Sequence, residues 1–166
     1  MTRLIAVLLG LLPSLALACE GGEFIQFGST EVWPGVHGMV QLYNPPTSPC
    51  DVQIRRLSVS ASTGTGGFVI NRFDRRLDNW MGGNNKRLDA LNANQPEASV
   101  YTHFSSVLVG TGVTEYFMKP GFSGDMLTPL TPPLILPPGV GIYVGTDPGV
   151  GLSAHFEWSE VPAEVQ

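Results

Sequence analysis

The chain has 166 residues, of which 43% are hydrophobic and only 14% are charged, and this balance excludes an intrinsically disordered protein. Its 20 glycines and 14 prolines are spread along the whole length, which excludes long helices and favours short strands joined by turns. The formal net charge of −5, without a basic strand interleaved with aromatic residues, argues against nucleic acid as a partner. We therefore expect one domain with a single core.

The first 18 residues have the three parts of a secretory signal peptide. Arg3 supplies a positive charge, an apolar run follows over residues 4–12, and an A-x-A site ends at Ala18. This run is shorter than a helix that crosses a membrane usually needs. We therefore divide the chain into an apolar segment, residues 1–18, which is either cleaved or retained as an arm, and a single domain, residues 19–166.

The two cysteines, Cys19 and Cys50, have two alternative fates. If the segment before Cys19 is removed on export, only one disulfide is possible, and it would stabilise the domain by about 3 kcal/mol. In a reducing compartment both would be free thiols. Cys19 directly follows Ala18 and so loosely fits a bacterial lipoprotein site, which is the only route to a membrane that we expect.

Seven or eight short strands are predicted from the alternation of apolar and polar residues. The clearest is the last, where Leu152, Ala154, Phe156 and Trp158 share one face. A turn at Pro138-Gly139 separates the two strands before it. In chain order the predicted strands are 39–43, 52–61, 68–70, 100–109, 113–118, 133–137, 140–144 and 152–159. This pattern predicts an all-β fold, an antiparallel β-sandwich or jelly roll.

The strand at 52–61 contains a break in its alternation. The apolar residues stand at even numbers up to Ile54 and at odd numbers from Leu57. Because side chains alternate with a period of two, this one-residue shift predicts a β-bulge near Arg55 and Arg56.

Between Phe73 and Ala98 the apolar period fails, and the sequence predicts one long loop. Such a long connection is uncommon in a compact domain, so it is either a functional excursion or hides a short element. The residues around Trp80, with Leu88 and Leu91, could supply one helical turn.

The candidate partner-binding residues are basic and aromatic. Seven of the nine Lys and Arg lie between Arg55 and Arg87. The stretch from Arg72 to Arg87, with five basic residues against Asp74 and Asp78, could meet an acidic partner, although a solvated loop is the more ordinary interpretation. Exposed tryptophans would mark a glycan or protein interface. The candidates are Arg72, Arg75, Arg76, Lys86, Arg87, Trp33 and Trp80.

No catalytic constellation is visible in the sequence. The histidines, His37, His103 and His155, lack the spacing that would place two imidazoles on one metal ion. There is no G-x-S-x-G nucleophile elbow, and no glycine-rich loop precedes a helix pattern. We therefore predict a protein that is not an enzyme, with no catalytic residue, metal or cofactor.

Two stretches resemble structural proteins of tailed-phage virions. Residues 42–62 hold an Asn-Pro turn, then Ser48, then a strand that ends in small hydroxyl residues. Residues 133–160 hold an apolar Pro-Pro-Gly turn and a last strand that finishes in Trp-x-Glu. The resemblance implies a jelly-roll virion component, a capsid decoration or tail-associated protein, that docks on other subunits and forms a homo-oligomer such as a trimer.

The alternative function is an exported bacterial binding module, either soluble or lipid-anchored through Cys19, that recognises a glycan or a protein. It requires processing between Ala18 and Cys19. The first function places the protein in the virion. The second makes it secreted, periplasmic or anchored in the outer membrane.

Overall fold

The computed structural model describes residues 19–32, 34–63, 67–78, 84–87, 95–108, 114–117 and 126–163. Within these ranges the chain forms ten strands and no helix, so no described helix is long and apolar enough to cross a membrane. The strands are β1 (Gly22–Thr30), β2 (His37–Tyr43), β3 (Cys50–Thr63), β4 (Phe68–Phe73), β5 (Asn84–Arg87), β6 (Ser99–Ser105), β7 (Thr114–Phe117), β8 (Met126–Leu136), β9 (Gly141–Thr146) and β10 (Gly151–Pro162).

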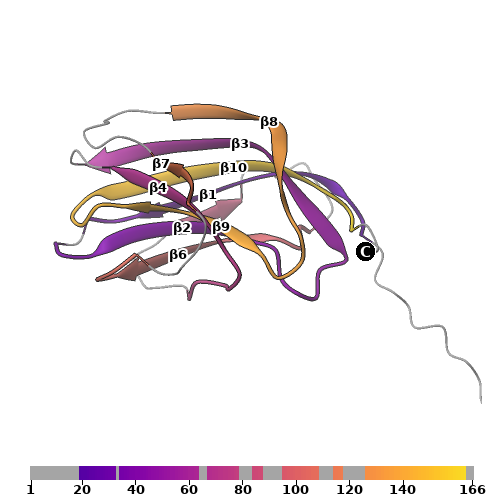
Figure 1. The fold of residues 1–166 in the computed structure, drawn as a ribbon, viewed down its shortest axis with the longest axis horizontal. Helices are drawn as coiled ribbons and strands as arrows, with labels where there is room; N and C mark the ends of the chain where they lie inside the picture. Colours follow the sequence, from indigo (N-terminus) through magenta and orange to yellow (C-terminus); the bar gives the residue numbers. More distant parts are fainter. Residues whose placement is uncertain are drawn as a thin grey trace, which may run out of the picture.

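Two antiparallel sheets pack face to face (Figure 1). The strand order is β5-β1-β10-β3-β8 in the first sheet and β6-β2-β9-β4-β7 in the second. The four-residue strands β5 and β7 stand at edges, and the remaining eight longer strands make two four-stranded layers. The predicted antiparallel β-sandwich is therefore confirmed.

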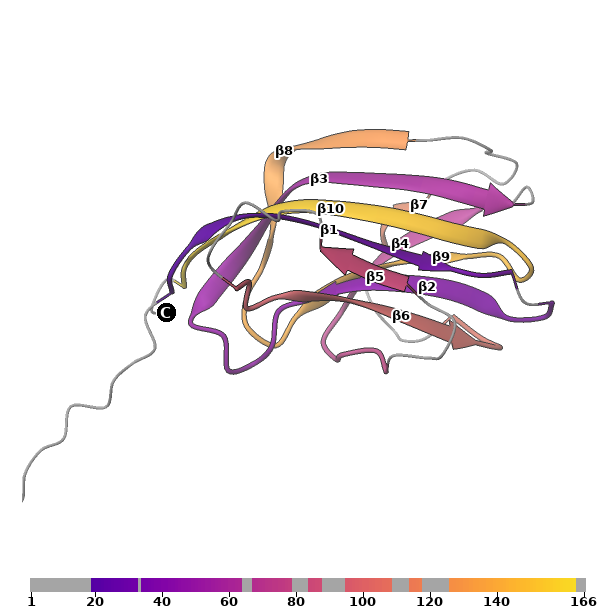
Figure 2. The ribbon, with the colours of Figure 1, turned by 180° about the vertical axis from the view of Figure 1, so that it is seen from behind.

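The pairing of the strands defines the topology as a jelly roll. β1 pairs with β10, β2 with β9, β3 with β8 and β4 with β7, all antiparallel. Each pair joins an early strand to a late one, so these eight strands follow the path of one long hairpin rolled around the core. β5 and β6 come between β4 and β7 in the chain and extend the opposite edge of the sandwich, beside β1 and β2 (Figure 2).

The predicted β-bulge is confirmed at Arg55. Ile54 is opposite Trp158 and Arg56 is opposite Glu157, so Arg55 is the extra residue on β3. The pairing with β8 is also irregular at this point, since Ile54 is opposite Leu134 and Arg56 is opposite Pro129, with residues 130–133 of β8 between the two pairs. Because of the bulge, Ile54 and Leu57 both face inward, with 0% and 3% of their surface exposed.

Strand β1 was not predicted because its inward face mixes apolar and polar residues. Phe24 is in the core, but Gln26 and Thr30 on the same face bind backbone groups instead. Gln26 Oε1 accepts a hydrogen bond from the N–H of Val100, and Thr30 Oγ1 accepts one from Leu152. Polar residues with such roles hide the period of two.

Of the two alternatives for the stretch between Phe73 and Ala98, the structure has the hidden short element, because the stretch contains β5. Its sequence, Asn-Asn-Lys-Arg, has no apolar residue, and its pairing with β1 uses backbone groups that carry no sequence signal. The helical turn suggested around Trp80, Leu88 and Leu91 lies outside the described residues. Strands β6 and β7, although near in sequence, stand at opposite edges of the second sheet.

The core lies between the two sheets. Trp158, predicted to be buried, packs against Phe24 with ring centroids 5.7 Å apart, and both are 1% exposed. Burying a large aromatic side chain stabilises a fold by roughly 2–3 kcal/mol. The turn predicted at Pro138-Gly139 is also present, with Gly139 at a φ of 84°, as a type II turn requires.

Candidate interaction site

A second, smaller apolar cluster covers the outer face of the second sheet. It consists of Met39, Phe73, Leu77 and Tyr143, with Leu108 packed against it. Antiparallel sheets commonly leave one face to solvent, and here the segment after β4 folds back over that face instead. Burial raises the pKa of Tyr143 above its usual value of 10.0, although a hydrogen bond with Asn71 opposes the shift.

The segment after β4 is held by a buried glutamine. The Nε2 of Gln41 donates to the carbonyl of Arg75, and its Oε1 accepts from the N–H of Leu77, both at 2.7 Å. Gln41 is 0% exposed; its bond with Leu77 is buried and its bond with Arg75 is partly buried. One ring nitrogen of His103 lies 3.0 Å from the carbonyl oxygen of Asp78 and adds a further contact.

Two of the predicted basic residues are presented on this segment. The guanidinium of Arg75 lies 5.3 Å from the ring centroid of Phe73, and that of Arg76 lies 5.5 Å from the ring centroid of Tyr101. Both arginines are exposed. Stacking of this kind orders a guanidinium and leaves its N–H groups free to bind an anion.

The structure does not gather the five basic candidates into one patch. Arg75 and Arg76 lie over the second sheet, Arg72 is on the inward side of β4 at the sandwich edge, and Lys86 and Arg87 belong to β5 at the opposite edge. Trp33 and Trp80 lie outside the described residues.

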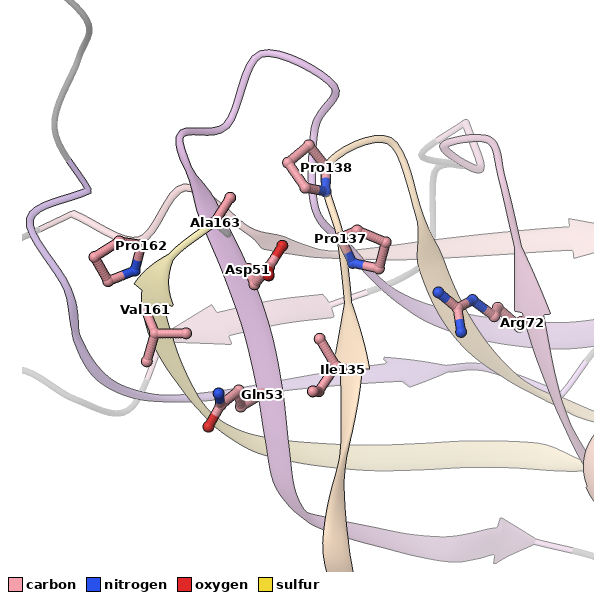
Figure 3. A pocket seen from close by; sticks show the side chains of 9 residues that line it. All are labelled: Asp51, Gln53, Arg72, Ile135, Pro137, Pro138, Val161, Pro162 and Ala163. Carbon is pink, nitrogen blue, oxygen red and sulfur yellow. The ribbon is translucent and has the colours of Figure 1, made fainter. Parts of the chain in front are cut away.

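Arg72 lines an open groove of about 910 Å³ where β4 faces β8. Figure 3 shows Asp51 and Gln53 on one side of it, Arg72 on the other, and Ile135 between them. The walls are mainly apolar and are completed by Pro137, Pro138, Val161, Pro162 and Ala163. The groove is open, and its lining contains one acidic and one basic side chain, those of Asp51 and Arg72.

Residues 42–62 and residues 133–160 meet at this end of the sandwich. The Nδ2 of Asn44 donates to the carbonyls of Cys50, at 2.8 Å, and Leu136, at 3.0 Å. Its backbone N–H donates to the carbonyl of Val140. A single buried asparagine therefore joins the β2–β3 connection to the β8–β9 turn.

The Trp-x-Glu ending of the last strand has a structural role. Glu160 is 4% exposed and accepts three hydrogen bonds, from the indole N–H of Trp158 and from the backbone N–H groups of Glu97 and Ala98. These bonds fix the residues that lead into β6 to the end of β10. The sequence alternation could not reveal this, because a carboxylate on the apolar face looks like an exception.

Cys19 and Cys50 form a disulfide, with their Cα atoms 5.2 Å apart. It attaches the chain before β1 to the first residue of β3, next to the groove residue Asp51. The sulfur of Cys19 is then not available for a thioether, so lipid attachment and this disulfide exclude each other.

The histidines have separate surroundings. One ring nitrogen of His37 lies 2.6 Å from the carbonyl oxygen of Thr146, and His155 packs against Phe27 with ring centroids 5.3 Å apart. Among the described residues, no group of three or more His, Cys, Asp or Glu side chains could hold a metal ion.

No family model matches the chain, and no curated protein or solved structure matches it either. The class of the protein is therefore defined by its own strand pairing, as a jelly-roll β-sandwich with one sheet covered on its outer face. Its function must be argued from the surfaces described above.

Proposed function

We propose that the chain is a non-enzymatic structural protein of a phage virion, which docks on the capsid or the tail through contacts with other protein subunits. The main observation in support is the contact between the two stretches that resemble phage structural proteins, residues 42–62 and 133–160. They are about 90 residues apart in sequence, and Asn44 joins them within hydrogen-bond distance. A resemblance whose two parts form one structural unit is less easily produced by chance than two unrelated matches.

The topology supports the same proposal by analogy, because jelly rolls are frequent among viral capsid domains. Fold alone does not decide function, so the edges of the sheets also matter. The outer strand β8 carries prolines, of which Pro132 and Pro133 are exposed. Proline blocks the pairing of one sheet edge with another, which favours docking through faces and loops over uncontrolled strand addition.

The proposal can be tested by immuno-electron microscopy of particles released from cells that carry the gene. Antibodies raised against the folded domain should label intact particles at a fixed position, because a docked subunit has a defined place. Antibodies against an unrelated exported protein of the same cells are the control. Label found only on cell envelopes, with bare particles, would reject the virion function.

The disulfide favours the second candidate function, an exported bacterial binding module, because disulfides persist in oxidising compartments. This module would use its exposed loops to bind a glycan or a protein. Sequencing the N-terminus of the native protein separates the cases. A start at Cys19 in envelope fractions without particles would support export, whereas a retained Met1 would exclude it.

A further inference from the structure

The chain carries two consecutive arginine pairs, and their environments differ. On β3, Arg55 forms an ion pair with Glu23, and Arg56 forms one with Glu157. After β4, Arg75 and Arg76 stack on aromatic rings, and no described residue forms an ion pair with either. One pair is therefore neutralised by ion pairs within the chain, whereas the other forms no ion pair with a described residue, although Asp74 and Asp78 lie next to it in sequence.

The second pair is also held in place before any partner arrives. Gln41 fixes the backbone on both sides of Arg76 with two hydrogen bonds, one buried and one partly buried. Leu77, 4% exposed, is inserted into the apolar cluster beneath the segment. Preorganisation reduces the entropy lost on binding, and a stacked guanidinium can offer two parallel N–H groups to a carboxylate.

The distribution of charge along the chain identifies a suitable partner. Seven of the nine Lys and Arg lie from Arg55 to Arg87, where Asp74 and Asp78 are the only two of the 14 acidic residues. The rest of the chain is therefore strongly acidic. Its exposed carboxylates include Glu20, Glu31 and Glu97, which form no ion pair with a described residue.

We propose that Arg75 and Arg76 form a docking site for carboxylates on a second copy of this chain. The proposal rests on the proposed function, since it names a contact by which copies would assemble. A basic site on one copy and an acidic surface on the next make a head-to-tail contact, which closes into a ring or continues along a particle.

The test is sedimentation velocity of the full chain as cells process it, at about 50 mM and about 500 mM salt, where charge screening differs strongly. The unchanged protein should self-associate at low salt and dissociate at high salt. R75A/R76A should weaken self-association at least about tenfold. R55A/R56A is the matched control, because it removes the same two charges from a pair that is already neutralised, and its self-association should stay within about twofold.

A second measurement covers the case in which R75A/R76A does not fold. Arg76→Lys keeps the charge, and a carbodiimide should join the introduced lysine to a carboxylate of another copy, which peptide mass spectrometry would identify. A monomer at low salt, equal weakening by both double variants, or cross-links within one copy only would overturn the proposal. Low-salt binding to heparin or DNA, with no self-association, would also overturn it.

These outcomes are separate from the fate of the virion function. Self-association through Arg75 and Arg76 without label on particles would reject the virion function and keep the docking site. If particles are labelled but the protein does not self-associate through these arginines, the docking site is rejected and the virion function is kept.

Discussion

At the scale of single residues, the fold depends on a few buried polar side chains that bind the main chain of distant segments. Gln41, Asn44 and Glu160 are each at most 4% exposed. Each one fixes a connection that has little apolar content of its own. Because unpaired buried polar groups are costly, their loss should cost more than the loss of a surface ion pair.

Glu160→Gln should lower the free energy of unfolding by about 2–3 kcal/mol, because the amide group would face N–H donors that the carboxylate now satisfies. Urea unfolding followed by tryptophan fluorescence measures the change. Glu157→Gln on the same strand is the control, and we expect it to cost less than about 1 kcal/mol because its ion pair is partly exposed. Equal effects would show that the three bonds of Glu160 contribute little.

Tyr143 predicts a dependence of stability on alkaline pH. Its pKa is raised in the folded state by burial, so the unfolded chain ionises first as the pH rises above 10.0. This contribution to stability is fully present below that pH and is lost as the pH rises towards the folded pKa. Tyr143→Phe should therefore make the alkaline fall in melting temperature shallower. An unchanged slope would mean that another group controls it.

At the scale of strands, the bulge gives a sharp prediction about deletions. Arg55 has no opposite residue on β10, so its deletion keeps the pairs between β3 and β10 in register on both sides. Deleting Ser58 would instead move Val59, now 2% exposed, to the outer face. We expect the Arg55 deletion to fold with a modest loss, about 1 kcal/mol. The Ser58 deletion should yield no soluble folded protein, and circular dichroism with thermal melting compares the two.

The sequence predicted those strands whose two faces differ in polarity, and it located the bulge from a single change of parity. It could not predict β5, because a polar edge strand is held by backbone hydrogen bonds alone. From the sequence alone, Arg75 and Arg76 could not be distinguished from Arg72, because residues that are close in sequence can lie on opposite sides of a sheet. Their difference depends on Gln41, which in the sequence looks like an ordinary outward residue of a strand.

At the scale of the whole molecule, the disulfide staples the chain before β1 to the start of β3 across a separation of 31 residues. By loop-closure entropy this should stabilise the domain by roughly 3–4 kcal/mol. Reductant should therefore lower the urea midpoint, and Cys50→Ser should show the lower midpoint with or without reductant. A midpoint that reductant does not change would mean that the bond does not form in the native protein.

The charged residues of the molecule are unevenly distributed, with a basic stretch from Arg55 to Arg87 in an otherwise acidic chain. A β-sandwich with a covered core, a β8 edge protected by prolines and an uneven distribution of charge is suited to assembly with other subunits. The most direct test of this account is quantitative mass spectrometry of gradient-purified particles from cells that carry the gene. The chain should co-sediment with the particles at a constant ratio to their main capsid protein; its absence from infectious particles would reject a structural role in the virion.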